Sequence, residues 1–231
     1  ADETRRTRVG DAVPLRGLIE ISNHCLRQCH YCGLRGANAR LGRYRMTADE
    51  ILDCAREAVR LGCGTVVLQS GEDPGLGRDW IADLVRRIKA ETSAAVTLGL
   101  GERTLADYAC WREAGADRVL LKFETSDRAL YGRVHPHLVA GEPDRLALLP
   151  QLRALWYEIG SGVMIGLPGQ TFATLAADIE SFLSLDLDMI GVGPFLPHPE
   201  TPLGKRCAAP AIPDQVPNTD VMACKAIARI V

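Results

Sequence analysis

Six short runs of aliphatic and β-branched residues alternate with amphipathic segments along the chain. They predict strands at 15–21, 65–68, 95–98, 118–123, 162–165 and 189–192. The residues within each run are almost continuously apolar, whereas a strand with one face in water alternates apolar and polar residues. Continuous runs are typical of parallel strands that are covered on both faces. The pattern therefore predicts an α/β protein built on a parallel sheet.

Amphipathic helices are expected between these strands, the first after Thr47 and the others at 79–89, 104–114, 144–157, 171–185 and 219–231. Thr47 and Glu50 have the spacing of a capping box, which satisfies free amides at a helix N-terminus. Gly115 follows the third helix at the position where glycine commonly ends a helix. Residues 193–219 contain seven of the thirteen prolines, and we expect no regular structure there.

Each predicted strand is followed by a short stretch of unusual composition. In chain order these stretches read SNHC, QSGEDP, GLGE, ETS, GLPGQT and GPFLPHPETP. The carboxyl ends of parallel strands lie at one end of the sheet, where their loops surround a common site. Six loops around one mouth favour a (β/α) TIM-type barrel over a doubly wound open sheet. Because a closed barrel needs eight strands, we expect a partial barrel with about six of eight βα units.

The bulk composition fits a single domain over residues 1–231. The chain is 47% apolar and 24% charged, which is ample for one hydrophobic core. It lacks an initiator methionine and ends on an apolar run, so we expect a domain that is truncated at its C-terminus.

Charge and hydropathy exclude several classes of function. The net charge of −2 leaves no basic excess for nucleic acid, and no apolar run reaches the length of a membrane span. The polar, charged N-terminus is not a secretory signal, so we expect a cytoplasmic protein. Eight cysteines in such a chain do not indicate a disulfide framework. Five scattered ones are expected to be buried small side chains or incidental thiols: Cys54, Cys63, Cys110, Cys207 and Cys224.

The other three cysteines, Cys25, Cys29 and Cys32, form a C-x3-C-x2-C motif in the loop after the first strand. Iron–sulfur cubes are ordinarily held by four thiolates, so three thiolates would leave one iron with an open position for a substrate or cofactor. The alternative is a zinc site with His24 or His30 as the fourth ligand. The asymmetric spacing and the lack of a second Cys/His pair nearby disfavour zinc.

The motif, with Tyr31 directly before its last cysteine, resembles the signature of the radical S-adenosylmethionine (SAM) family. Within that family, several longer stretches resemble the [FeFe]-hydrogenase maturases of the HydE type. These are IEISNHCLRQCHYCGLRGAN, LGRYRMT, VVLQSGEDP, AGADRVLLKFETSD, MIGLPGQT and DMIGVGPFLPHPETPL. The resemblance covers residues 15–203. Biotin synthase and methylornithine synthase share it more loosely.

The resemblance implies two cofactors, a [4Fe–4S] cluster and SAM. It implies that Cys25, Cys29 and Cys32 are the cluster ligands and that the open iron binds the methionine part of SAM. It also implies a set of residues around SAM: Tyr31, Gln69, Ser70, Gly71, Glu72, Thr97, Glu124, Arg145, Met164 and Met189.

Some implied roles have a clear physical basis. Glycine at Gly71 lets the main chain approach the amino group of SAM. Glu124 would accept charge-assisted hydrogen bonds from SAM, and Arg145 would pair with its carboxylate. Arginines near the cysteines would offset thiolate charge or lie in a solvated surface: Arg27, Arg35, Arg40, Arg43 and Arg45.

At Gln170 the sequence departs from an adenine-contacting motif of the wider family, which ends in glutamate, so the contact of this loop with adenine is left open. The sequence departs from the maturase pattern itself at four positions: Gly99, Lys122, Phe123 and Trp156. Glycine replaces serine at the first, and glycine is expected at Trp156. These changes leave the SAM residues intact and concern the substrate.

The implied activity is reductive cleavage of SAM to a 5′-deoxyadenosyl radical during maturation of the hydrogenase H-cluster. The implied partners are a small-molecule or organometallic substrate, an external low-potential electron donor and other hydrogenase maturation proteins. One alternative is another enzyme of the biotin synthase and methylornithine synthase group that acts on a small molecule. A second is a non-catalytic iron–sulfur or zinc-binding module.

Overall fold

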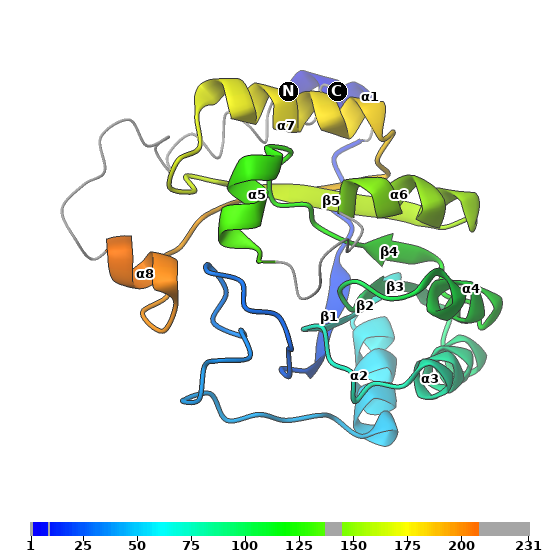
Figure 1. The fold of residues 1–231 in the computed structure, drawn as a ribbon. Coiled ribbons are helices and arrows are strands. Elements are labelled where there is room, and N and C mark those ends of the chain that lie inside the picture. Colours follow the sequence, from blue (N-terminus) through cyan, green and yellow to red (C-terminus); the bar gives the residue numbers. More distant parts are fainter. Residues whose placement is uncertain (1, 9, 137–144, 208–231) are drawn as a thin grey trace.

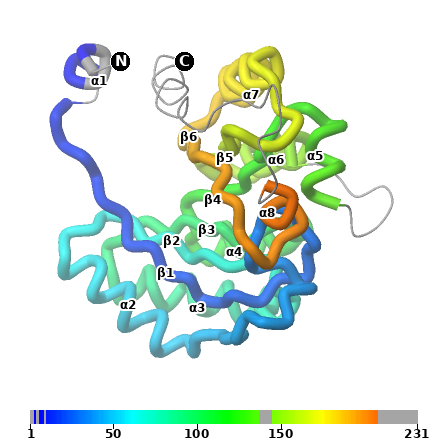
Figure 2. Tube along the Cα trace, turned by 90° about the vertical axis from the view of Figure 1, so that its left-hand side faces the viewer, coloured from blue at the N-terminus to red at the C-terminus, as the bar shows by residue number. Residues whose placement is uncertain are grey.

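The computed structural model describes residues 2–8, 10–136 and 145–207, and its centre is one sheet of six parallel strands. The strands are β1 Arg16–Ser22, β2 Thr65–Ser70, β3 Ala95–Gly99, β4 Arg118–Leu120, β5 Glu158–Ile165 and β6 Met189–Pro194. They pair in chain order, from β1 to β6, as Figure 2 shows from below upward. The sheet curls into a half-barrel, which confirms the predicted (β/α) fold with six units.

Helices follow the strands and form an arc along the outer side of the sheet (Figure 1). The helices of this arc are α2 Ala48–Arg60, α3 Arg78–Glu91, α4 Leu105–Glu113, α6 Arg145–Ala154 and α7 Phe172–Ser184. The capping box of Thr47 and Glu50 is present at the start of α2. Gly115, at φ +106°, follows the end of α4 as expected.

Three further short helices were not predicted: α1 Asp2–Arg8, α5 Arg128–Val134 and α8 Pro202–Cys207. The expectation that 193–219 has no regular structure is wrong for α8. Pro202 occupies the first helical position, where proline is favoured because its missing N–H would have no helical partner anyway. The predicted helix at 219–231 lies outside the described residues.

The core lies between the sheet and the helical arc. Alternate side chains of the first strands, such as Ile19, Val66 and Leu98, are buried on the helix side. They pack with the apolar faces of α2 and α3, including Ile51 and Ile81, in one large cluster. The alternation of strand side chains thus gives the sheet a helix-facing surface and an inner surface that faces the lumen of the half-barrel.

The boundaries of β4 and β5 differ from the prediction. β5 begins at Glu158, not 162, and α6 ends at Ala154, because Trp156 lies at φ +67° and cannot continue a helix. The first part of β5 is rich in glycine and serine, since a Cβ at Gly162 would lie 2.0 Å from the carbonyl oxygen of Gly191. β4 ends at Leu120, not 123, and the hydroxyl of Ser161 bonds to the chain that follows it.

The scattered cysteines are only partly as expected. Cys63, Cys110 and Cys207 are half-buried against apolar clusters. Cys54 is exposed on α2, so of the two expectations for it the buried small side chain is wrong. Cys224 lies outside the described residues. In the part of the chain that the structure describes, we find no helix that is long and apolar enough to cross a membrane.

Replacing Gly162 with alanine should destabilise the sheet, because the new Cβ would clash with the backbone of β6. We expect the free energy of unfolding, measured by urea denaturation, to fall by about 3 kcal/mol. Gly132→Ala in α5 is the control. No atom lies within 4 Å of its added Cβ, so helix propensity should raise stability by about 0.5–1 kcal/mol. Equal effects of the two substitutions would contradict the assigned packing.

Trp156→Gly should stabilise the protein. The indole is 82% exposed, so little packing is lost, and glycine tolerates the left-handed backbone. We expect a gain of about 1 kcal/mol in the free energy of unfolding. Trp156→Ala keeps a Cβ and should gain nothing. If Trp156→Gly instead lowers the free energy of unfolding, the contacts of the indole stabilise the protein by more than the left-handed backbone costs.

Candidate functional site

A pocket of about 260 Å³ lies at the carboxyl ends of the strands. Loops after β1, β2 and β3, the segment after β4, and the start of α6 line it. Ten of the thirteen residues that the sequence singled out are in its wall: Cys25, Cys29, Tyr31, Cys32, Gln69, Ser70, Gly71, Glu72, Glu124 and Arg145. The structure thus brings together side chains that are up to 120 positions apart in sequence.

The other three predicted residues do not line this pocket. Thr97 is 1% exposed within β3, and its hydroxyl has no hydrogen-bond partner among the described residues. Met164 is half-buried against a second apolar cluster near Tyr31. Met189 lies at the start of β6, and its sulfur accepts a hydrogen bond from Arg16 Nη1 at 2.8 Å. Their predicted roles therefore stay predictions.

The loop that carries the three cysteines is fixed by hydrogen bonds to its backbone. The Arg43 guanidinium donates to the carbonyl oxygens of Asn23 and Leu34, near the two ends of the motif. His30 in the middle donates its N–H to Val134 of α5 at 2.7 Å and accepts from Leu203 of α8 at 3.0 Å. This loop, α5 and α8 lie together in the left half of Figure 1. The loop therefore ties β1 to elements that follow β4 and β6.

The three thiols line one pocket, and their sulfur atoms do not all lie within 4.8 Å of one another. Tetrahedral zinc places its sulfur ligands about 3.8 Å from one another, given bonds of about 2.3 Å. Among residues 2–8, 10–136 and 145–207, a metal ion could be held by sets of three or more His, Cys, Asp or Glu side chains whose possible ligand atoms all lie within 4.8 Å of one another. None of these sets contains a cysteine. A cube binds each thiolate through a different iron, so the wider spacing and the all-sulfur donor set fit a [4Fe–4S] cluster.

Burial raises the pKa of the Cys29 thiol to about 12 and also raises the pKa of Cys32. At neutral pH both groups are protonated in the metal-free protein and are weak nucleophiles. Metal ligation requires thiolates, so binding would release these protons. The site therefore fits ligation better than covalent catalysis by a thiol.

Gly71 is confined by the cysteine loop. An added Cβ would lie 2.4 Å from the carbonyl oxygen of His24 and 3.1 Å from the sulfur of Cys25. Only glycine lets the β2 loop approach the first cysteine this closely. The predicted contact between this backbone and SAM stays a prediction.

Four buried charged side chains form a closed ring behind the thiols. Arg27 pairs with Glu72, and its Nη2 lies 2.8 Å from Glu102. Arg145 completes the ring, at 3.1 Å from Glu72 and 2.7 Å from Glu102. The four side chains are between 3% and 11% exposed. They come from the loops after β1, β2 and β3 and from the first residue of α6.

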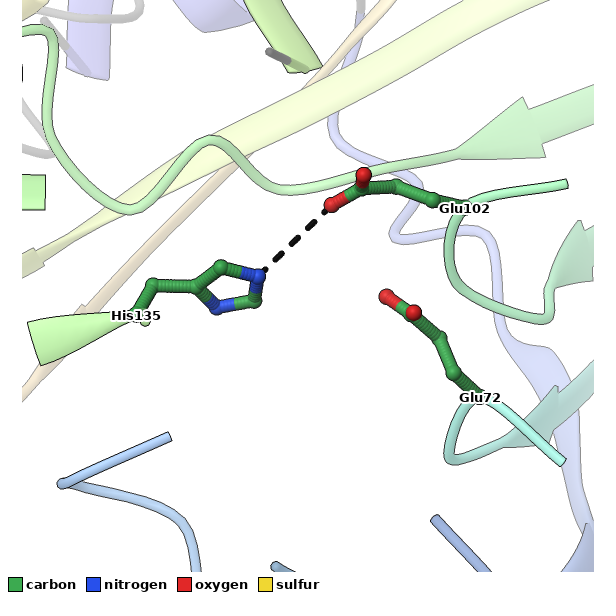
Figure 3. A group of neighbouring side chains, drawn as sticks. All are labelled: Glu72, Glu102 and His135. Atoms are coloured by element: carbon green, nitrogen blue, oxygen red, sulfur yellow. Dashed lines mark ion pairs between the residues drawn. The ribbon is translucent and has the colours of Figure 1, made fainter. Parts of the chain in front are cut away.

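His135 joins this ring at the end of α5. Its Nε2 lies 3.6 Å from Glu102 (Figure 3). Its Nδ1 lies 3.1 Å from the sulfur of Cys29. Burial by itself raises the pKa of Glu102, but His135, Arg145 and Arg27 outweigh it and lower the pKa to about 2. Glu72, Glu102 and His135 are close enough to hold a metal ion. Because both arginines already neutralise the carboxylates, we assign them to the ion-pair ring.

Two more polar groups line the pocket at the end of β4. Lys122 Nζ lies 3.2 Å from Glu124, whose side chain is 9% exposed. The carbonyl oxygen of Lys122 accepts a hydrogen bond from Arg145 at 2.7 Å. With Glu72, Glu102 and His135 Nε2, the last at 3.5 Å, Arg145 therefore has four partners in the protein.

The sequence did not assign Glu102, His135 or Lys122 to the site. Glu102 belongs to the GLGE stretch after the third strand, whereas the resemblance implies Thr97 as the site residue of that strand. Arg27 was one of five arginines for which a solvated surface was the alternative, and it is 2% exposed. Of the others, Arg45 pairs with buried Asp73, and Arg40 is exposed. No pattern marked His135.

Residues 19–182 match the Radical SAM superfamily. The chain is 50% identical over 203 residues to "[FeFe] hydrogenase maturase subunit HydE" of Thermotoga maritima, covering 88% of this chain and 58% of that protein. It is 28% identical to 3-methylornithine synthase of Methanosarcina barkeri, covering 84% and 55%. The chain therefore spans little more than half the length of these curated relatives.

Solved structures show the same fold. Methylornithine synthase (PylB) superposes with a TM-score of 0.83 at 24% identity, covering 99% of this chain and 66% of that one. The hydrogenase maturase HydG superposes with a TM-score of 0.80 at 21% identity, covering 97% and 52%. The strand order, the convergent cysteines and the family match agree: the chain belongs to the radical SAM superfamily of enzymes, whose cofactors are a [4Fe–4S] cluster and SAM.

Proposed function

We propose that this chain performs the radical SAM step of [FeFe]-hydrogenase H-cluster maturation. The proposal rests on one observation: the three cysteine thiols line the same pocket as Arg27, Glu72 and Arg145 of the ion-pair ring. The similarity to the HydE maturase supports this choice within the superfamily.

When bound, the cluster and SAM supply a 5′-deoxyadenosyl radical by one-electron cleavage of the S–C5′ bond. The chain itself binds the cluster and SAM, orients SAM and shields the pocket from water. Cys25, Cys29 and Cys32 would hold the cluster, and the Gly71 backbone would face the amino group of SAM. The Glu124 carboxylate would accept hydrogen bonds from SAM. Leu34, Leu120 and Leu121 in the pocket wall would keep water away from reactive species.

Arg145 is the proposed partner of the SAM carboxylate, and the ring defines how it acts. Its bonds to Glu72, Glu102 and the Lys122 backbone fix the plane of the guanidinium. A guanidinium has five N–H groups, and with the contact to His135 four of them face protein partners, which leaves one N–H of Nη1 for a ligand. A preoriented cation loses less side-chain entropy when a carboxylate binds.

The proposed reaction needs partners that the pocket does not supply. An external low-potential electron donor must reduce the cluster. The substrate would be a small molecule or an organometallic, sulfur-bearing precursor of the H-cluster, handed over among hydrogenase maturation proteins. We propose that this takes place in the cytoplasm.

Replacing a ligand cysteine should abolish cluster binding. In the anaerobically reconstituted chain, Cys25→Ala should reduce iron and sulfide content to a small fraction of the unaltered level, because two thiolates cannot hold the cube. The unaltered protein should give a [4Fe–4S]⁺ EPR signal that changes on adding SAM. Cys54→Ala, at an exposed thiol, is the matched control and should retain both properties. Stoichiometric zinc in place of iron would contradict the proposal.

Glu124→Gln and Arg145→Lys should weaken SAM binding while cluster content stays. Glu124→Gln removes the negative charge from a hydrogen bond to SAM, and Arg145→Lys keeps the positive charge but loses the planar guanidinium. Each change should raise the Kd for SAM roughly 10- to 100-fold. SAM titration of the reconstituted protein by EPR or calorimetry measures this. Glu57→Gln and Arg112→Lys, on α2 and α4, are controls and should leave Kd unchanged. An unaltered Kd in both site variants would refute these assignments.

A further inference from the structure

Glu124 enters the pocket from an unusual turn. Its φ is +63°, a value that a glutamate rarely adopts. The N–H of Thr125 bonds to the carbonyl oxygen of Phe123 at 2.7 Å, which closes a three-residue turn around Glu124. A γ-turn with positive φ at its central residue is rare and strained. The surrounding structure must therefore impose this conformation.

β5 holds one side of the turn. The N–H of Glu124 donates to Gly162 at 2.9 Å, and its carbonyl oxygen accepts from Met164 at 3.0 Å. The Ser161 hydroxyl bonds to Leu121 and Phe123, on the chain leading into the turn. These bonds fix the chain up to Glu124 but not the residues after it.

Asp178 holds the other side. It lies on α7, in the outer layer, and is 0% exposed. Its Oδ1 accepts hydrogen bonds from the N–H and the hydroxyl of Ser126, the latter at 2.6 Å. The hydroxyl of Thr125 lies 3.3 Å from the same oxygen. One carboxylate oxygen thus binds both residues that follow Glu124.

A buried carboxylate is costly unless it is hydrogen-bonded or paired with a cation. Burial raises the pKa of Asp178, which agrees with its enclosed position. Asp178 does not line the pocket. Apart from a contact with the Gln170 side chain, its hydrogen bonds go to Thr125 and Ser126, the two residues directly after the strained turn, so these bonds support the turn.

We propose that Asp178 is a positioning residue that sets the direction of the Glu124 side chain by clamping Thr125 and Ser126. The inference rests on the proposed role of Glu124 in binding SAM. Without the clamp the turn relaxes toward negative φ, and the carboxylate swings away from its place in the pocket. Asp178 therefore contributes to SAM affinity through Glu124 alone.

A double-mutant cycle on the anaerobically reconstituted chain tests this. Asp178→Ala should weaken SAM binding about tenfold, comparable to loss of one charge-assisted hydrogen bond. In a Glu124→Ala background the same change should cause no further loss. Asp178→Asn, which keeps an oxygen acceptor for the Ser126 N–H, should restore most of the affinity. In the metal-free protein, hydrogen exchange at the Ser126 amide should quicken in Asp178→Ala.

Asp188→Ala is the matched control, because that carboxylate also accepts from a backbone N–H, of Ile159, at the opposite end of the sheet. It should leave SAM affinity unchanged. An equal loss from Asp178→Ala with and without Glu124 would overturn the inference, as would a fall in cluster content, since either marks a general structural role. If Glu124→Ala itself leaves SAM affinity unchanged, the proposed function of Glu124 fails instead.

A milder variant covers the case in which Asp178→Ala does not fold. Ser126→Ala removes one donor to Asp178 and keeps the buried carboxylate with its bond to the Ser126 N–H. SAM affinity should fall by less than in Asp178→Ala, again only when Glu124 is present. Unchanged affinity in this variant overturns the inference.

Discussion

The buried ring of Arg27, Glu72, Arg145 and Glu102 is the interaction on which the pocket depends. Its four members come from four separate segments, so the ring fixes the relative positions of the loops after β1, β2 and β3 and of α6. Charges alternate around it, and each carboxylate meets two cations. Breaking a buried pair by removing one partner costs about 3–5 kcal/mol, because the remaining charge is left uncompensated in a poorly solvated site. The loops around the thiols therefore form one unit.

The ring also determines what the cysteine loop can do. Arg27 lies between Cys25 and Cys29, so its burial in the ring anchors the motif from within. Arg43 and the bonds of His30 to α5 and α8 anchor the motif from outside. The thiols of Cys25, Cys29 and Cys32 already line one pocket before any metal is present. Such preorganisation lowers the entropy that ligation must overcome.

Much of the fold could be predicted because the strands are almost continuously apolar runs between amphipathic helical segments. The prediction failed where another requirement replaced apolarity. Gly162 must be glycine because β6 passes too close for a Cβ, so the start of β5 did not resemble a strand. The cysteines were found from local spacing. Arg27 and Glu102 belong to the site only through partners far away in sequence, and an arginine in a charged loop more often lies at the surface.

Trp156 and Glu124 both have a left-handed backbone, but they differ in burial and in the contacts that hold this conformation. Trp156 lies at φ +67° with an exposed side chain, away from the pocket, and its strain is a departure from glycine at a turn between α6 and β5. Glu124 lies at φ +63° with a buried side chain in the pocket wall, held by β5 before the turn and by Asp178 after it. Strain that several independent contacts maintain is typical of a working site. The difference in support, rather than the φ value, favours the proposal that the Glu124 side chain takes part in SAM binding.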